Sequence, residues 1–149
     1  MKKSTVWMLA VGGVLLAAAA AWQLVPTEVK IDHTDRALVA RGEPLYAQHC
    51  ASCHGARLEG QPDWQSRNAQ GRLPAPPHDD SGHTWHHDDI VLFEVTKYGI
   101  AKHAPAGYQS DMPGFADRMS DAEIVATLAF IKSRWTAEVH GKRSTAGMN

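Results

Sequence analysis

Two cysteines and a histidine lie within one five-residue segment of the chain. They are the only cysteines among the 149 residues, and the segment reads Cys50-Ala51-Ser52-Cys53-His54. In a C-x-x-C-H arrangement the two thiols can add across the vinyl groups of a haem while the next imidazole ligates the iron. Two residues between the sulfurs let one short turn reach both edges of the porphyrin, and the following histidine is carried beneath the iron. The spacing therefore predicts covalent haem c at Cys50 and Cys53, with His54 as an iron ligand.

Three other interpretations of this motif are weaker. A disulfide between Cys50 and Cys53 would close a very short, strained loop that adds little stability. A thioredoxin-like redox pair needs a strand before the first cysteine, whereas a helix is predicted there. A zinc site needs two more ligands, and the nearest downstream pair, His78 and His83, lies far beyond zinc-finger spacing.

A helix is predicted before the motif and a long loop after it. The helix should run from Thr34 or Asp35 to about Cys50, with apolar residues at near-helical spacing on one side. Pro44 lies inside it and removes one backbone hydrogen bond, so we expect a kink or a restart near Glu43. Residues 56–82 contain four prolines and no regular period, which predicts a loop.

Two further helices are predicted downstream, and no alternating pattern typical of strands appears. One should begin between Thr84 and His87 and stop at Gly99. The other begins with a capping box of Ser120 and Glu123. Its apolar residues repeat at spacings of four, three and four: Ile124, Leu128, Ile131 and Trp135.

With these elements in place, the chain resembles the class I monohaem c-type cytochromes from about residue 35 to residue 135. The matching residues are Arg41-Gly42 and Leu45-Tyr46 before the motif, Met112-Pro113-Gly114-Phe115 after it, and Trp135 at the end of an aromatic-bearing last helix. The resemblance implies an all-α fold, the class I cytochrome c fold, in which the first and last helices cross around a covalently bound haem. It also implies that Gly42 allows close approach to the region of Phe130.

The residue opposite His54 decides whether the iron carries electrons or binds small molecules. A thioether there gives a saturated electron carrier with a raised potential. The other methionines have simpler roles: Met1 and Met8 in the N-terminal apolar run, Met148 in the tail, and Met119 packing on Ile124 beside the helix cap. Met112 lies in a Gly/Pro-rich loop and matches the ligand position of the family. We therefore expect Met112 as the second metal ligand, with His103 as its rival.

Residues around the ligands can be assigned weaker roles. The second ring nitrogen of His54 needs a partner, for which a loop proline carbonyl such as that of Pro62 is suitable. Four side chains of the loop region could donate to the haem propionates: Trp64, Trp85, Arg67 and Arg72. Leu58 and Phe115 are expected to line the pocket as apolar residues.

Residues 78–89 contain four histidines and four aspartates. His83 and His87 could share a helical face, and with His86 they could form a second metal site, because imidazole and carboxylate suit Cu(II) or Zn(II). We favour an interpretation without metal, in which Asp88 and Asp89 stabilise the dipole of the following helix. The histidines then lie on a solvated surface or form hydrogen bonds in the loop at the haem edge.

The N-terminus resembles an export segment. Lys2 and Lys3 precede an apolar run from Val6 to Val25, which is long enough to span a bilayer, while alanines 17–21 offer cleavage sites. We expect residues 1–27 to be a signal peptide or, more favoured, a retained signal-anchor forming a transmembrane helix. Residues 28–140 then form the haem domain and residues 141–149 a flexible tail. This arrangement places the domain in the periplasm, either anchored to the bacterial inner membrane or soluble.

Charge and motif together predict the function. Without Lys2 and Lys3 the chain has 13 basic residues against 16 acidic ones, which argues against nucleic-acid binding. We expect an exported single-electron carrier of a respiratory chain that passes electrons between a membrane donor and a terminal acceptor, with no catalytic residues and no small-molecule substrate. The alternatives are a haem subunit of an oxidase or dehydrogenase, a gas- or peroxide-reactive haem protein with a labile sixth ligand, and a periplasmic metal-binding protein.

Overall fold

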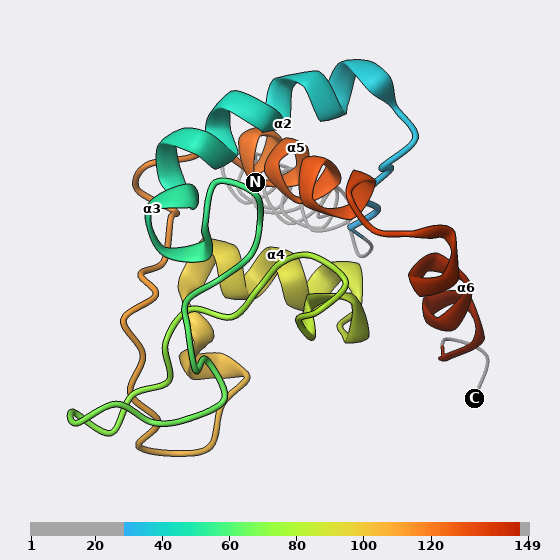
Figure 1. Ribbon diagram of the computed structural model, residues 1–149. Helices are drawn as coiled ribbons and strands as arrows, with labels where there is room; N and C mark the ends of the chain where they lie inside the picture. The colour runs from blue at the N-terminus through green and yellow to red at the C-terminus, as the bar shows by residue number, and fades with distance from the viewer. Residues whose placement is uncertain (1–28, 147–149) are drawn as a thin grey trace, which may run out of the picture.

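A computed structural model of the protein describes residues 29–146, and this part of the chain consists of helices and loops without strands (Figure 1). The elements are α2 (Arg36–His49), α3 (Ala51–His54), η1 (Thr84–His86), α4 (Asp89–Tyr98), η2 (Ile100–Lys102), α5 (Asp121–Ser133) and α6 (Ala137–Ala146). The predicted all-α class is confirmed for these residues. None of these helices is long and apolar enough to cross a bilayer. The predicted export segment, residues 1–27, lies outside the described residues.

Helix α2 leads directly into the C-x-x-C-H motif. Its first turn is capped by Asp35, whose Oδ1 accepts the N–H groups of Ala37 at 2.9 Å and Leu38 at 3.1 Å. The helix is continuous through Pro44 to His49, so the chain does not restart near Glu43 as one prediction had it. A proline removes only one bond of the helical ladder, and the packing of α2 on α5 outweighs that loss.

Helices α2 and α5 pack so closely that their backbones are in contact (Figure 1). A Cβ atom added to Gly42 would lie 2.0 Å from the carbonyl oxygen of Ala126 and 2.9 Å from Cβ of Phe130. The expected close approach of Gly42 to the region of Phe130 is therefore confirmed. Because α2 ends at the motif, this contact fixes where the motif lies relative to the core.

Helix α5 begins as its sequence predicts. Ser120 and Glu123 form the reciprocal capping box, and Met119 and Ile124 are both buried in the core. The helix ends at Ser133, so Trp135 lies just beyond it. The indole Nε1 of Trp135 donates to the carbonyl oxygen of His78 at 2.8 Å.

The helix ending at Gly99 starts later than predicted. Residues 84–86 form the separate 3₁₀ turn η1, and α4 begins only at Asp89. The backbone at His87 and Asp88 is extended, with ψ angles of 144° and 156°, which interrupts the helical path. The predicted stop at Gly99 is confirmed, and this residue has a φ of 82°, a conformation that favours glycine.

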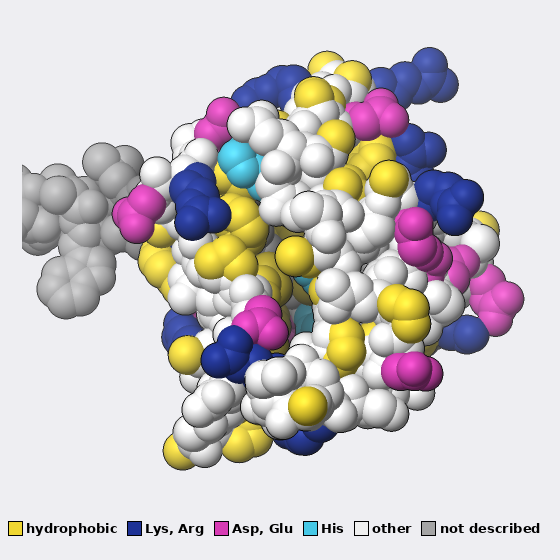
Figure 2. All heavy atoms as spheres, turned by 60° about the vertical axis from the view of Figure 1, so that its left-hand side comes forward, with side chains coloured by type: hydrophobic (Ala, Val, Ile, Leu, Met, Phe, Trp, Pro, Cys, Tyr) yellow, Lys and Arg dark blue, Asp and Glu magenta, His cyan; other side chains and the backbone are white. Residues whose placement is uncertain are grey.

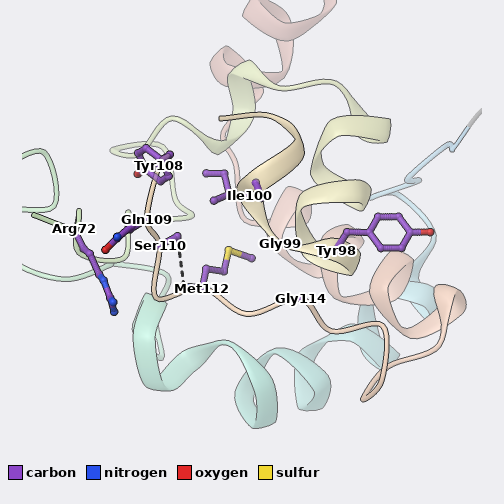
Figure 3. A pocket seen from close by; sticks show the side chains of 10 residues that line it. Arg72, Tyr98, Gly99, Ile100, Tyr108, Gln109, Ser110, Met112 and Gly114 are labelled. Carbon is purple, nitrogen blue, oxygen red and sulfur yellow. Dashed lines mark hydrogen bonds between the residues drawn. The ribbon is translucent and has the colours of Figure 1, made fainter. Parts of the chain in front are cut away.

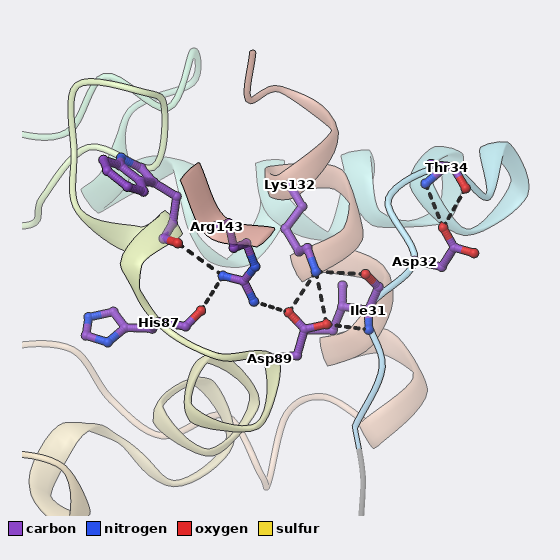
Figure 4. Close-up of polar contacts among 8 residues, drawn as sticks. Ile31, Asp32, Thr34, His87, Asp89, Lys132 and Arg143 are labelled. Atoms are coloured by element: carbon purple, nitrogen blue, oxygen red, sulfur yellow. Dashed lines mark hydrogen bonds and ion pairs between the residues drawn. The ribbon is translucent and has the colours of Figure 1, made fainter. Parts of the chain in front are cut away.

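A polar cluster ties four segments together around Asp89 (Figure 4). Lys132 Nζ lies 2.7 and 3.0 Å from the two carboxylate oxygens of Asp89 and donates to the carbonyl oxygen of Ile31 at 2.9 Å. Ile31 N–H donates to the same carboxylate at 2.8 Å, and Arg143 also binds it. Burial lowers the pKa of Lys132, an effect that the contact with Asp89 opposes.

The C-terminal segment takes part in this cluster. Residues 141–146, which we had expected in a flexible tail, belong to α6, and Arg143 of this helix donates to the carbonyl oxygen of Trp85 at 3.2 Å and also to that of His87. The sequence pattern missed this helix because it has few apolar residues and is held mainly through polar contacts. Residues 147–149 lie outside the described part.

Candidate functional site

The cysteine motif forms one tight turn between two helices. Cys50 is both the C-cap of α2 and the N-cap of α3. Its carbonyl oxygen accepts the N–H groups of Cys53 at 3.1 Å and His54 at 2.9 Å. Both thiols are free; Cys50 is partly buried and Cys53 is exposed. Burial raises the pKa of the Cys50 thiol to about 11, with a further contribution from nearby Cys53.

His54 is buried, with 7% of its surface exposed, and its ring is oriented by a hydrogen bond. Nδ1 donates to the carbonyl oxygen of Pro76 at 2.8 Å. This bond places the ring proton on Nδ1 and leaves the lone pair on Nε2 for a metal. The partner is Pro76 rather than Pro62, because the long loop folds back so that residues 75–78 lie along residues 58–61, as in the bond from Gln61 N–H to the carbonyl oxygen of Ala75. Burial lowers the pKa of His54, an effect that the Pro76 bond opposes.

Tyr46 holds the end of the attachment turn through a hydrogen bond, a role that was not predicted from the sequence. Its side chain is 1% exposed, and its hydroxyl donates to the carbonyl oxygen of Gly55 at 2.8 Å. Burial raises the pKa of Tyr46 far above 10, so the hydroxyl keeps its proton for this bond. The pairing of Leu45 with Tyr46 in the family pattern was the available signal.

Met112 lines a pocket of about 360 Å³ that lies between the end of α4, η2, residues 108–114 and Arg72. Figure 3 shows its thioether among the pocket residues, between the loop of Ser110 and the backbone near Gly99. Ser110 Oγ accepts the N–H of Met112 at 3.1 Å and so holds the backbone of the loop. The rival His103 has its Nε2 2.9 Å from Glu94 Oε2.

The four candidate propionate donors differ in what they already bind. Trp85 Nε1 donates to the carbonyl oxygen of Gly82 at 3.1 Å, and Arg67 donates to that of Gly71 at 2.6 Å. The ring of Trp64 stacks on that of His83. Arg72 binds Asp111 through its terminal nitrogen, while its Nε is buried and has no partner in the described part of the chain. An orphaned guanidinium N–H beside the Met112 pocket fits a haem propionate, because carboxylates are its natural partners.

The pocket region also has the apolar character that a porphyrin requires. Leu58 and Phe115 are 4% and 5% exposed, and both belong to the core cluster on which Met112 packs. Figure 2 shows a hollow on one face of the molecule, lined by hydrophobic side chains, with histidine atoms inside it and charges of both signs around it. The chemistry of the residues therefore suits a large apolar group with a central metal and acidic edges.

The histidine-rich stretch spreads its imidazoles over several separate contacts. His83, His86 and His87 are exposed, and His83 and His86 stack on Trp64 and Trp85 respectively. Within residues 29–146, no group of three or more histidine, cysteine, aspartate or glutamate side chains is placed to hold a metal ion. Three histidines of this stretch thus lie at the surface, whereas His78 does not share their exposure.

These features define an all-α, haem-binding domain with a C-x-x-C-H attachment turn. The family model for cytochrome c matches residues 39–135, and the chain belongs to the cytochrome c family. Its cofactor is covalently attached haem c with its iron, and Cys50 and Cys53 fit the attachment motif. Membership indicates an electron-transfer protein with redox proteins as partners, rather than a catalytic enzyme.

One solved structure provides an independent comparison of the fold. It is cytochrome cL from the marine methylotrophic bacterium Methylophaga aminisulfidivorans, with a TM-score of 0.50 and 22% sequence identity. The match covers 84% of this chain and 85% of the other. At this level of sequence identity, the comparison shows a similar fold and nothing further.

Proposed function

We propose that this protein is an exported monohaem cytochrome c that carries single electrons, with Cys50 and Cys53 holding the haem and His54 and Met112 ligating its iron. The observation that carries the proposal is the 2.8 Å bond from His54 Nδ1 to the carbonyl oxygen of Pro76. It leaves a buried imidazole with one free nitrogen directly after two free thiols on the same turn. A disulfide would not need that arrangement, and a zinc site would need further ligands that do not gather at this turn within residues 29–146.

Met112 is the better second ligand on three grounds. Its thioether lies in the pocket, whereas Met119 is 4% exposed in the core next to the cap of α5. The imidazole of His103 is already paired with Glu94. A thioether opposite an imidazole saturates the iron and raises its potential, which suits an electron carrier.

The bound haem supplies the one-electron Fe(III)/Fe(II) couple. The chain keeps the surroundings of that couple constant: Pro76 holds Nδ1 of His54 through a hydrogen bond, and Ser110 holds the backbone of Met112. Leu58 and Phe115 exclude water, while Arg72 Nε is available to a propionate. A site that holds its ligands fixed changes little between oxidation states, so electrons can enter and leave without substrate binding.

The donor and acceptor are proposed to be a membrane-bound redox protein and a terminal acceptor of a respiratory chain. Docking around the hollow of Figure 2 would be transient, as in other weak redox encounters. Residues 1–27 support placement on the periplasmic side of the bacterial inner membrane, through their basic start and apolar run.

Two measurements on the protein matured in an export-competent host test this proposal. A pyridine haemochrome spectrum of the membrane and soluble fractions should report one thioether-linked haem and show where it resides. Carbon monoxide added to the ferrous protein at neutral pH should leave its spectrum unchanged. Ready binding of carbon monoxide would instead indicate a gas-reactive protein, and stable co-purification with a large membrane complex would indicate an oxidase or dehydrogenase subunit.

A further inference from the structure

A second imidazole lies flat against His54. The ring centroids of His54 and His78 are 3.8 Å apart and their planes differ by 20°. His78 follows Pro76 by two positions, so the segment that accepts the hydrogen bond from His54 also supplies a ring that covers one face of it. The sequence alone indicates for His78 only a remote zinc ligand or a member of the histidine-rich stretch 78–89.

The backbone of His78 is held from two sides. Its N–H donates to the carbonyl oxygen of Leu58 at 2.8 Å, and its own carbonyl oxygen accepts from Trp135 Nε1 at 2.8 Å. The two preceding residues are prolines, whose rings fix the φ angles of the segment. The rings of Tyr46 and His78 meet in an edge-type arrangement at a centroid distance of 6.1 Å.

One ring nitrogen of His78 has no polar partner within the described residues. Its Nδ1 is shielded from solvent and has no hydrogen-bond partner there. A shielded nitrogen without a partner costs stability that an apolar residue of similar volume would not cost. Local stability therefore does not explain a histidine here, whereas a flat ring beside another flat ring has a geometrical effect.

We propose that His78 is a positioning residue that fixes the plane of the axial imidazole of His54. A hydrogen bond to Pro76 restrains one atom of the ring, which can still tilt about that contact. A face-to-face neighbour restrains the ring normal, so the two contacts together define the orientation. This inference rests on the proposed role of His54 as an iron ligand.

The orientation of an axial imidazole has measurable consequences. In the haem-loaded protein the ring plane of His54 would affect the overlap of the imidazole π orbital with the iron d orbitals. Together with the thioether of Met112, it would therefore influence the spread of the haem methyl resonances and the g values of the ferric form. Groups that orient a ligand in this way tune the metal without touching it. The expected consequence of removing the His78 ring is a changed magnetic signature at an unchanged ligand set.

The test uses the haem-loaded ferric protein and three substitutions, His78→Phe, His78→Leu and His78→Gln. His78→Phe keeps a flat ring, and the other two keep much of the volume without one. We expect His78→Phe to retain the wild-type order of haem methyl resonances, while His78→Leu and His78→Gln lose it and shift the reduction potential. His83→Leu, at an exposed ring that stacks on Trp64, is the matched control and should leave the spectra unchanged.

A purely structural role would give a different result. If His78→Leu and His78→Gln lowered the melting temperature but kept the wild-type resonance order and g values, the positioning role would be overturned. It would be overturned equally if His78→Phe changed the spectra as much as the other two. Failure of the proposed function would show separately, as a wild-type protein whose spectra lack a low-spin haem with an axial histidine.

Discussion

The backbone of Gly42 lies directly against the carbonyl oxygen of Ala126, so close that a Cβ atom on Gly42 would come within 2.0 Å of that oxygen. Only hydrogen fits between α2 and α5 at this point. The contact is with backbone, which cannot rotate away as a flexible side chain could. Because α2 runs from here to Cys50, the spacing of two helices fixes the position of the haem-attachment turn.

Replacing Gly42 by alanine should therefore separate the two helices and destabilise the protein. Overpacking of this kind costs about 1–3 kcal/mol, and a backbone obstacle favours the upper end. Urea unfolding of the haem-loaded protein measures the loss. Gly141→Ala is the control, because a methyl group there meets no atom within 4 Å; equal stability of Gly42→Ala and wild type would contradict the close packing.

Replacing Met112 by alanine should open one face of the iron. We expect loss of the charge-transfer band of the methionine-ligated ferric haem, a lower reduction potential, and new binding of carbon monoxide to the ferrous form. Met119→Leu is the matched control, since it changes the buried methionine of the core while keeping its volume. A Met112→Ala protein with the wild-type spectrum would show that another residue is the ligand.

Replacing Asp89 by asparagine should destabilise the cluster that joins Ile31, α4, α5 and α6. Lys132, with only 7% of its side chain exposed, would lose its charged partner, and losing one partner of such a pair costs about 3 kcal/mol. Thermal and urea unfolding measure the change. Glu43→Gln, which breaks an exposed pair with Arg134, is the control and should cost less than about 1 kcal/mol. Similar losses of stability in the two variants would show that the Asp89 cluster contributes no more than an exposed ion pair.

Acidification should weaken the contact between His33, which lies just before α2, and His140 of α6. The rings of His33 and His140 stack at 3.9 Å, and the pKa of His33 is lowered from 6.5, first by burial and then by the charges of His140 and Lys132; Asp32 and Asp89 oppose the shift. The unfolded chain thus binds a proton at His33 more readily than the folded one. Stability should fall as the pH drops through 6.5 and level off below the folded pKa.

The variant His33→Gln isolates this contribution. It should be less stable than wild type at pH 8, because the stack is lost, yet show a shallower decline of the free energy of unfolding between pH 7 and about pH 5. His86→Gln, at an exposed histidine, serves as the control. An unchanged pH slope in His33→Gln would contradict the lowered pKa.

Much of the fold could be predicted because its signals are local. The capping box of Ser120 and Glu123 and the stop at Gly99 involve residues within one helical turn, and both were confirmed. The close approach at Gly42 followed from the resemblance to a family rather than from any pattern in the chain. The start of α4 was predicted too early, because charged residues near a helix start do not say which of them begins it.

By itself, the sequence determined the chemistry of the attachment turn, since two thiols and an imidazole at fixed spacing require no distant partner. Only the tertiary structure decided what surrounds His54. Every carbonyl of the loop offers the same acceptor, and the folding of that loop chose Pro76 over Pro62 and brought His78 onto the ring. The tertiary structure also decided the position of α6. This helix is held by polar contacts such as that of Arg143 with Asp89, which are far apart in the chain. Interactions between distant residues depend on the path of the backbone, which no local pattern specifies.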